Sequence, residues 1–203
     1  MHKIYTLTHN GSFISNCYLV ESNGSWAVVD PSVEYDRAVA EYPQIEGHIS
    51  AILITHAHFD HIYAIKSWAK AGATVMVGER DASALSDPYR NCYLGFLGVE
   101  DGYFDEYQSI NDGDKIALGD DAFEVISTPG HTPGGVCYKI GNDVFVGDTL
   151  FAGGGYGRCD LPGGDGEELD NSLFKLFSKM LIGRFYPGHG PVGTFEDSIK
   201  YFN

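Results

Sequence analysis

Four side chains able to bind a metal ion stand within six residues of each other in the segment Thr55-His56-Ala57-His58-Phe59-Asp60-His61. Neutral imidazoles bind zinc, iron and similar divalent ions, and a carboxylate compensates part of the charge of the ion. Four such groups so close in sequence cannot all reach one ion without strain, but their spread suits two neighbouring ions. In a chain of this composition, H-x-H-x-D-H is expected by chance roughly once in a thousand sequences, so the segment predicts a metal site.

Three later segments offer further metal-binding side chains. Each candidate donor follows a predicted strand or lies in the turn after one, so all of them could open onto one rim. These donors are His131 in Thr128-Pro129-Gly130-His131-Thr132, Asp148 in Phe145-Val146-Gly147-Asp148-Thr149, and His189 in Tyr186-Pro187-Gly188-His189-Gly190-Pro191. The remaining histidines, His2, His9 and His48, have no ligand-like neighbours and are interpreted as structural.

The element that must position the first motif is the apolar run 51–54, which predicts a strand buried on both faces. A helix is expected over 61–71, ending at Gly72, and another strand over 74–77. The motif therefore lies in a β-loop-α-β unit, at the end of a strand, where a rigid scaffold holds binding residues.

Strands and helices follow each other along the whole chain without a repeat or a linker. This order predicts an α/β protein with a single domain over 1–203, in which two β-sheets pack between helices. Further strands are expected at 4–8, 13–21, 26–29, 115–118, 122–127, 136–140, 144–146 and 184–186, and further helices at 34–42, 167–181 and 195–202.

Residues 79–108 are less regular and rich in aromatic side chains. We interpret them as a helix with a surface excursion that acts as a lid, or equally as a source of aromatic core residues. The side chains in question are Tyr89, Tyr93, Phe96, Tyr103, Phe104 and Tyr107.

Composition excludes several classes of function. The 203 residues carry 13 Lys and Arg against 28 Asp and Glu, a net charge of −15, whereas binding to a phosphate backbone relies on clustered positive charge. No apolar stretch is long enough to span a membrane, and no apolar segment follows the N-terminal charge as in a secretory signal. The four cysteines show no C-x-x-C spacing, which fits reduced thiols. We expect a cytoplasmic protein acting on a small molecule, without nucleic-acid or membrane partners; the oligomeric state is left open.

The motifs T-H-A-H-F-D-H, P-G-H-T-P-G, G-D-T-L-F and P-G-H-G-P, in this order, resemble the metallo-β-lactamase superfamily. The resemblance implies a four-layer αββα sandwich with two divalent metal ions, zinc as the first choice and iron or manganese as alternatives. It also implies that Asp30, in V-V-D-P-S, orients the ligands. By motif, the first ion would be held by His56, His58 and His131, the second by Asp60, His61 and His189, and Asp148 would bridge both.

Within the superfamily, G-D-T-L-F followed by G-R-C-D-L-P-G-G-D resembles the glyoxalase II (hydroxyacylglutathione hydrolase) family, and most closely its short, single-domain bacterial members. The resemblance implies hydrolysis of S-D-lactoylglutathione or a related acyl thioester by metal-bound hydroxide, with Asp60, Asp148 and Arg158 as catalytic residues. Arg158 either contacts the loop of Asp148 or Asp160, or is a surface arginine paired with Asp160.

Two other activities on the same fold stay open. One is a persulfide dioxygenase with a single iron, which shares the G-R-x-D motif, and the other is a lactone or ester hydrolase. The best-known class of β-lactamases is excluded, because it has cysteine where this chain has Asp148 and arginine where it has His61.

Overall fold

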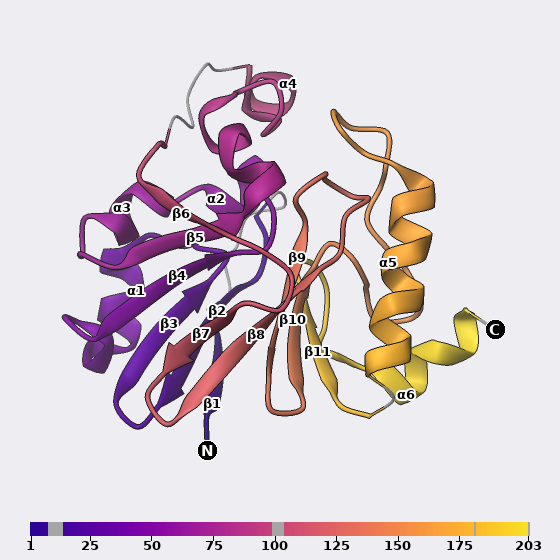
Figure 1. The fold of residues 1–203 in the computed structure, drawn as a ribbon. Helices are drawn as coiled ribbons and strands as arrows, with labels where there is room; N and C mark the ends of the chain where they lie inside the picture. The colour runs from indigo at the N-terminus through magenta and orange to yellow at the C-terminus, as the bar shows by residue number, and fades with distance from the viewer. Residues whose placement is uncertain (8–13, 99–103, 181, 203) are drawn as a thin grey trace.

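Two six-stranded β-sheets lie face to face in the computed structural model, and helices cover their outer faces (Figure 1). The structure describes residues 1–7, 14–98, 104–180 and 182–202. The layers are therefore helix, sheet, sheet and helix, as the sequence predicted.

The first sheet is formed by the N-terminal half of the chain, with its strands in sequential order. The first three strands are antiparallel and the last four are parallel, so helical segments must return the chain between the parallel strands. The strands are β1 (Lys3–Leu7), β2 (Cys17–Ser22), β3 (Ser25–Val29), β4 (Ile49–Ile54), β5 (Thr74–Gly78) and β6 (Tyr107–Ile110). The helices are α1 (Tyr35–Glu41), α2 (Phe59–Ile62), α3 (Ile65–Ala69) and α4 (Tyr93–Leu97), with 3-10 helices at Pro43–Ile45 and Glu79–Ser86.

The second sheet has the order β12-β11-β10-β9-β8-β7. Only β10 and β11 are parallel, and helix α5 (Gly166–Lys179) makes the crossover between them. The strands are β7 (Lys115–Leu118), β8 (Asp121–Ser127), β9 (Val136–Ile140), β10 (Asp143–Gly147), β11 (Arg184–Pro187) and β12 (Gly193–Thr194). Helix α6 (Phe195–Ser198) and a 3-10 helix (Ile199–Tyr201) follow β12.

Strand β4 shows how the sequence specifies the layers. Because side chains alternate along a strand, Ala51 and Leu53 lie in the core between the two sheets, whereas Ile52 and Ile54 pack under the helices of the first layer. All four are buried, which confirms the prediction of a strand covered on both faces. The loop that follows β4 is therefore anchored in two cores at once.

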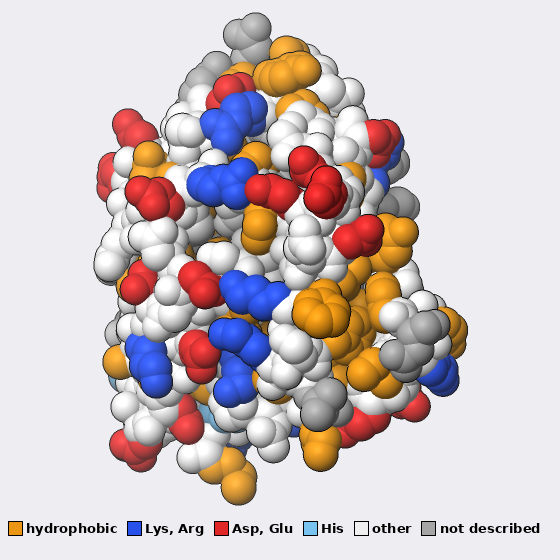
Figure 2. All heavy atoms as spheres, turned by 45° about the vertical axis from the view of Figure 1, so that its right-hand side comes forward, with side chains coloured by type: hydrophobic (Ala, Val, Ile, Leu, Met, Phe, Trp, Pro, Cys, Tyr) orange, Lys and Arg blue, Asp and Glu red, His pale blue; other side chains and the backbone are white. Residues whose placement is uncertain are grey.

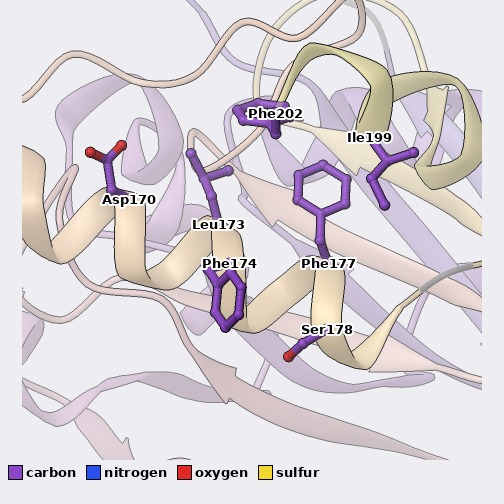
Figure 3. Close-up of a pocket in the computed structure, with 7 residues that line it drawn as sticks. All are labelled: Asp170, Leu173, Phe174, Phe177, Ser178, Ile199 and Phe202. Atoms are coloured by element: carbon purple, nitrogen blue, oxygen red, sulfur yellow. The ribbon is translucent and has the colours of Figure 1, made fainter.

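Helix α5 covers the second sheet. Asp165 caps its N-terminus by accepting hydrogen bonds from the backbone N–H groups of Glu167 and Glu168. The inner face buries Leu169, Leu173, Leu176 and Phe177. Phe174, on the outer face, is 78% exposed and borders a groove of about 500 Å³ beside the C-terminal helical segment, on the side where Figure 2 shows hydrophobic side chains gathered (Figures 2 and 3).

The structure corrects the predicted helix over 61–71, which is two short helices, α2 and α3. The first begins earlier, at Phe59, and the chain turns at Ala64, whose φ of −104° and ψ of 14° leave the helical region. The N–H of Ala64 donates to the carbonyl of Pro31 at 2.9 Å instead of continuing the helix. Tertiary contact with the loop after β3 thus overrides the local helical preference.

The aromatic segment also differs from the prediction, because it ends in strand β6 at the edge of the first sheet. The first three residues of β6 are exposed, so the strand lacks the alternation that would reveal it in the sequence. The aromatic residues divide between core and surface: Tyr93 and Phe104 are buried, whereas Tyr89 and Phe96 are exposed, and the role of the segment as a lid stays a prediction. Tyr103, like Phe13 of the predicted strand 13–21, lies outside the described residues. That strand begins only at Cys17.

None of the described helices combines the length and the apolar composition that crossing a bilayer requires.

Candidate metal centre

The seven side chains predicted as metal ligands come together at one edge of the sandwich. His56 and His58 lie in the loop after β4, and Asp60 and His61 lie in α2 directly behind it. In the second sheet β8 and β10 both run antiparallel to β9, and β11 runs parallel to β10, so all three end at the same edge. His131, Asp148 and His189 follow these three ends.

Their donor atoms form three overlapping groups in which all atoms lie within 4.8 Å of each other. The groups are His56 with His58 and His131, His56 with His61 and Asp148, and Asp60 with His61 and His189. Nε2 of His56 lies 3.2 Å from Nε2 of His131. Ligands about 2.0–2.1 Å from a tetrahedral ion lie about 3.3 Å from each other, so these donors are spaced as ligands of a shared ion.

The carboxylate of Asp148 lies between the first and the last of these groups. Its Oδ1 is 3.4 Å from Nε2 of His61, while its Oδ2 is 3.6 Å from Nε2 of His131 and 3.7 Å from Nε2 of His189. Asp60 belongs to the last group, and its Oδ2 lies 3.0 Å from Nε2 of His189. The carboxylate of Asp148 is therefore close to both groups: its Oδ2 lies near one histidine of each group, and its Oδ1 lies near His61 of the last.

Three buried polar atoms of the cluster have no hydrogen-bond partner among the described residues: Nε2 of His58, Nε2 of His61 and Oδ1 of Asp148. An unsatisfied buried polar atom costs about 1–3 kcal/mol, so native structures rarely keep several together without a reason. All three belong to imidazole or carboxylate groups that face one another. The donor set and its unsatisfied atoms fit divalent metal ions.

Burial controls the charge of the first histidines. Desolvation, together with the neighbouring His131, lowers the pKa of His58 to about 3. The pKa of His56 is lowered well below its usual value by burial and by His61. Both imidazoles are neutral at pH 7, which is the form that binds a metal ion.

The acidic side of the cluster behaves in the opposite way. Burial would lower the pKa of His61, but the carboxylates around it, Asp30 foremost, raise it well above the usual value. Burial would raise the pKa of Asp148, but His61 holds it well below the usual range. The carboxylate of Asp148 is therefore ionised and available to a cation.

Asp30 and Arg158 orient two of the donor histidines. Nδ1 of His61 donates to Oδ2 of Asp30 at 2.8 Å, and Nδ1 of His131 donates to the backbone carbonyl of Arg158 at 2.7 Å. In each ring Nδ1 is occupied as a donor, so Nε2 is the nitrogen directed at the centre of the cluster, where a metal ion would take the place of any proton that it carries. Asp30 also accepts hydrogen bonds from the N–H and the hydroxyl of Thr55, and its backbone has a left-handed φ of 52°, which is uncommon for a residue other than glycine.

Asp81 joins the loop after β4 to the loop after β8, and no motif in the sequence predicts this role. Its side chain is buried and accepts hydrogen bonds from the N–H of Ala57 at 3.1 Å, the hydroxyl of Thr132 at 2.7 Å and the N–H of Gly134 at 2.7 Å. Ala57 lies between two donor histidines, and Thr132 follows a third. Nothing in the sequence around Asp81 distinguishes it from a surface carboxylate, because its partners are remote in the chain.

Two glycines allow the backbone to approach the donors closely. A Cβ atom at Gly188 would collide with Oδ1 of Asp148 and the ring of His61, and one at Gly157 would collide with the ring of His131. Glycine is therefore required at both positions, because a side chain would displace the donors.

The side chain of Arg158 pairs with Asp160. Its Nε and one terminal nitrogen donate to the two carboxylate oxygens at 2.6 and 2.5 Å, and both side chains are exposed. This ion pair lowers the pKa of Asp160 to about 2. The part of Arg158 that touches the donor cluster is its backbone carbonyl.

The other histidines have the positions expected for structural residues. His2 binds Asp143, with its Nε2 2.9 Å from Oδ2, and His48 is exposed. His9 lies outside the described residues.

Comparison with known proteins agrees with this geometry. The family model described as "Metallo-beta-lactamase superfamily" matches residues 10–189. The probable polyketide biosynthesis zinc-dependent hydrolase PksB of Bacillus subtilis is 28% identical, over 98% of this chain and 84% of its own length.

Two solved structures are similar over almost their whole length. A B3 metallo-beta-lactamase, BLEG-1, superposes with a TM-score of 0.86 at 27% identity, covering 98% of this chain and 97% of its own. TTHA1623, in a di-iron-bound form, does so with a TM-score of 0.83 at 32% identity, covering 97% and 98%. The four-layer fold, the converging donors and the family match together show that this chain belongs to the metallo-beta-lactamase superfamily.

Proposed function

We propose that the protein is a metal-dependent hydrolase of thioesters, with two divalent ions held by the seven converging side chains. The observation that carries this proposal is the carboxylate of Asp148, which lies within 3.7 Å of His131 in the first donor group and of His61 and His189 in the last. His56, His58 and His131 would hold the first ion, Asp60, His61 and His189 the second, and Asp148 both.

When bound, such ions lower the pKa of water towards neutrality and polarise a carbonyl oxygen. The protein supplies orientation. Burial would raise the pKa of Asp60, but His61 and His189 lower it, so this carboxylate is a weak base that orients water rather than storing a proton. Asp60 and Asp148 both line the cavity beside the donors, where a thioester carbonyl would enter.

We propose zinc as the resident metal, with iron and manganese as alternatives. The name of PksB, a zinc-dependent hydrolase, supports zinc, and the di-iron form of TTHA1623 supports iron. Imidazole and carboxylate donors accept all three ions, so the ligand types do not select among them. The first and the last donor groups, which share no residue, favour two ions over the single iron of a persulfide dioxygenase.

The leading test substrate is S-D-lactoylglutathione, because G-D-T-L-F and G-R-C-D-L-P-G-G-D resemble glyoxalase II. We further propose a small-molecule substrate and a cytoplasmic location. The cytoplasmic location is supported by the four cysteines, which are free thiols, three of them buried, because thiols stay reduced in the cytoplasm.

The test combines metal analysis with an assay panel. Protein isolated without added metal is analysed for zinc, iron and manganese, then loaded with each and assayed for thiol release from S-D-lactoylglutathione and from coenzyme A and N-acetylcysteamine thioesters. We expect about two ions per chain and thiol release. The panel also contains glutathione persulfide with an oxygen electrode, a lactone and a chromogenic cephalosporin. Oxygen uptake with one iron per chain, or turnover of the lactone or the cephalosporin without thiol release, would overturn the proposal.

A further inference from the structure

A cavity of about 360 Å³ opens above the donor cluster. Its floor is made of the imidazoles and carboxylates already described. Its walls are mostly apolar and come from both halves of the chain, namely Phe59, Cys92, Phe96, Phe151 and Leu161. The volume lies near the lower end of the ~300–1,000 Å³ typical of small-molecule sites, so the cavity suits a short or medium-length group.

One wall is a pair of stacked aromatic rings. The rings of Phe59 and Phe96 lie 5.4 Å apart, centroid to centroid, at an interplanar angle of 25°. Phe59 is buried and packs against Tyr93, at 5.9 Å, so it is fixed in α2. Phe96, in α4, is 47% exposed. Helix α4 therefore presents an aromatic face to the cavity that a ligand would cover.

Phe151 forms another part of the apolar lining, next to the donor cluster. Phe151 packs near the ring of His189, with centroids 6.3 Å apart at 71°. Cys92 adds to the apolar lining, because burial raises the pKa of its thiol to about 11 and keeps it uncharged. A substrate group that extends from the centre of the cluster would thus contact apolar side chains on several sides.

The cavity offers little free positive charge. Arg158 is the only Lys or Arg among the described residues that line the cavity, and Asp160 already engages its guanidinium through two hydrogen bonds. Glutathione, with two carboxylates, or the phosphates of coenzyme A would find no unpaired cation in this lining. The thiol half of a biological thioester is polar and so must point outwards, and the apolar walls are left to the acyl half.

We propose that the substrate is a thioester with an apolar acyl chain, seated against the Phe59–Phe96 ring pair with Phe96 as a specificity-determining residue. This inference rests on the proposed thioester hydrolysis and adds the class of acyl group. A lactoyl group, which is short and hydroxylated, would leave the ring pair uncovered.

The test uses the metal-loaded protein and N-acetylcysteamine thioesters of acetate, butanoate, hexanoate and octanoate, with S-D-lactoylglutathione alongside. Burying a methylene group contributes about fourfold per carbon, so we expect kcat/KM to rise by about that factor per methylene until the cavity is filled. Phe96→Ala should flatten this rise, and Phe96→Leu should restore most of it. Phe174→Ala, on the exposed face of α5 outside the cavity, is the matched control and should leave the profile unchanged.

A binding measurement provides a second readout. The ketone analogue of the octanoyl thioester, with a methylene group in place of the sulfur, is titrated calorimetrically into the wild type and the three variants. We expect a negative heat-capacity change in the wild type and a weaker affinity in Phe96→Ala alone. Because Phe96 is half exposed, Phe96→Ala should keep its fold, which its thermal unfolding curve verifies.

The outcomes separate the two proposals. Thiol release that is independent of chain length, or faster with S-D-lactoylglutathione than with every alkyl thioester, overturns the inference about the acyl group and leaves thioester hydrolysis standing. A profile that Phe96→Ala does not alter removes the role of the ring pair. No thiol release from any thioester overturns the proposed function and the inference with it.

Discussion

Asp30 accepts a hydrogen bond from Nδ1 of His61 at 2.8 Å, with both side chains buried. This contact fixes the ring of His61 and leaves its Nε2 facing Asp148 at 3.4 Å. It also adds negative charge behind a ring that would donate to a cation. The position of one carboxylate outside the donor cluster therefore determines how a donor inside it is presented.

Asp30→Asn should weaken metal binding without removing it. The change keeps the shape of the side chain but removes its charge, and partners of this kind are worth about 10–100-fold in metal affinity. Competition with a chromophoric chelator measures the affinity. Asp170→Asn, an exposed carboxylate of α5, is the control. Equal affinities in Asp30→Asn and the wild type would show that Asp30 is only a structural residue.

Asp148→Ala should lose metal occupancy and turnover together, because both donor groups lose the carboxylate between them. The loss should exceed the ~10–100-fold effect expected for Asp30. Elemental analysis of the purified variant and thiol-release assays at saturating metal measure the two effects. Retention of metal and activity would exclude Asp148 as a bridging ligand.

Asp81→Ala should destabilise the protein even without metal, since three buried hydrogen bonds to a carboxylate are lost. We expect a loss of about 3–5 kcal/mol in the free energy of unfolding. Urea unfolding of the metal-free protein, followed by circular dichroism, separates this effect from metal binding. Asp105→Ala, at an exposed position, should change stability by less than about 0.5 kcal/mol. A metal-free Asp81→Ala as stable as this control would contradict the assignment.

Gly188→Ala should disturb the donor cluster although it removes no donor. The added Cβ would collide with Oδ1 of Asp148 and with the ring of His61. Metal content should fall while the circular dichroism spectrum stays close to that of the wild type. Gly166→Ala, where a Cβ would meet no atom within 4 Å, is the matched control. Full metal content in Gly188→Ala would mean that the turn can move away from the cluster.

The pairing of α5 with the second sheet predicts a pH dependence of stability. Burial alone would raise the pKa of Asp112, but Lys175 and the N–H of Ser127 hold it below its usual value. A lowered folded-state pKa contributes stability above the unfolded value of ~3.9, and this stability is lost as the pH falls through the folded pKa.

Asp112→Asn should therefore destabilise the protein at pH 7 by no more than about 1 kcal/mol, since the pair is partly exposed. The difference from the wild type should shrink below about pH 4. Unfolding curves at pH 7, 5 and 3.5 measure it. A difference that grows on acidification would contradict the assigned direction.

The convergence of the seven candidate ligands could be predicted from the sequence because each lies in a short motif at the end of a strand, as His56, His131 and His189 show. The layers could be predicted as well, since an unbroken apolar run such as 51–54 indicates a strand that is buried on both faces. Asp81 could not be, because its partners lie at Ala57, Thr132 and Gly134, far away in the chain.

Local pattern also failed where tertiary contacts decide the structure. The helix break at Ala64 depends on a carbonyl of the loop after β3, and strand β6 is specified by the free edge of β5 rather than by its own exposed residues. The aromatic segment before β6 contains both core and surface rings, and composition alone does not sort Tyr93 from Phe96. Its contribution to the cavity became visible only from the folded chain.

The first donor group (with His58) and the last (with Asp60) each contain residues that follow strands of both sheets. His56 and His58 are joined by His131, and Asp60 and His61 are joined by His189, so each group takes two members from the N-terminal half and one from the C-terminal half. Neither half alone assembles a complete group. An ion held by a whole group would bind the docked sandwich more tightly than either half alone, so it would also strengthen the contact between the two sheets.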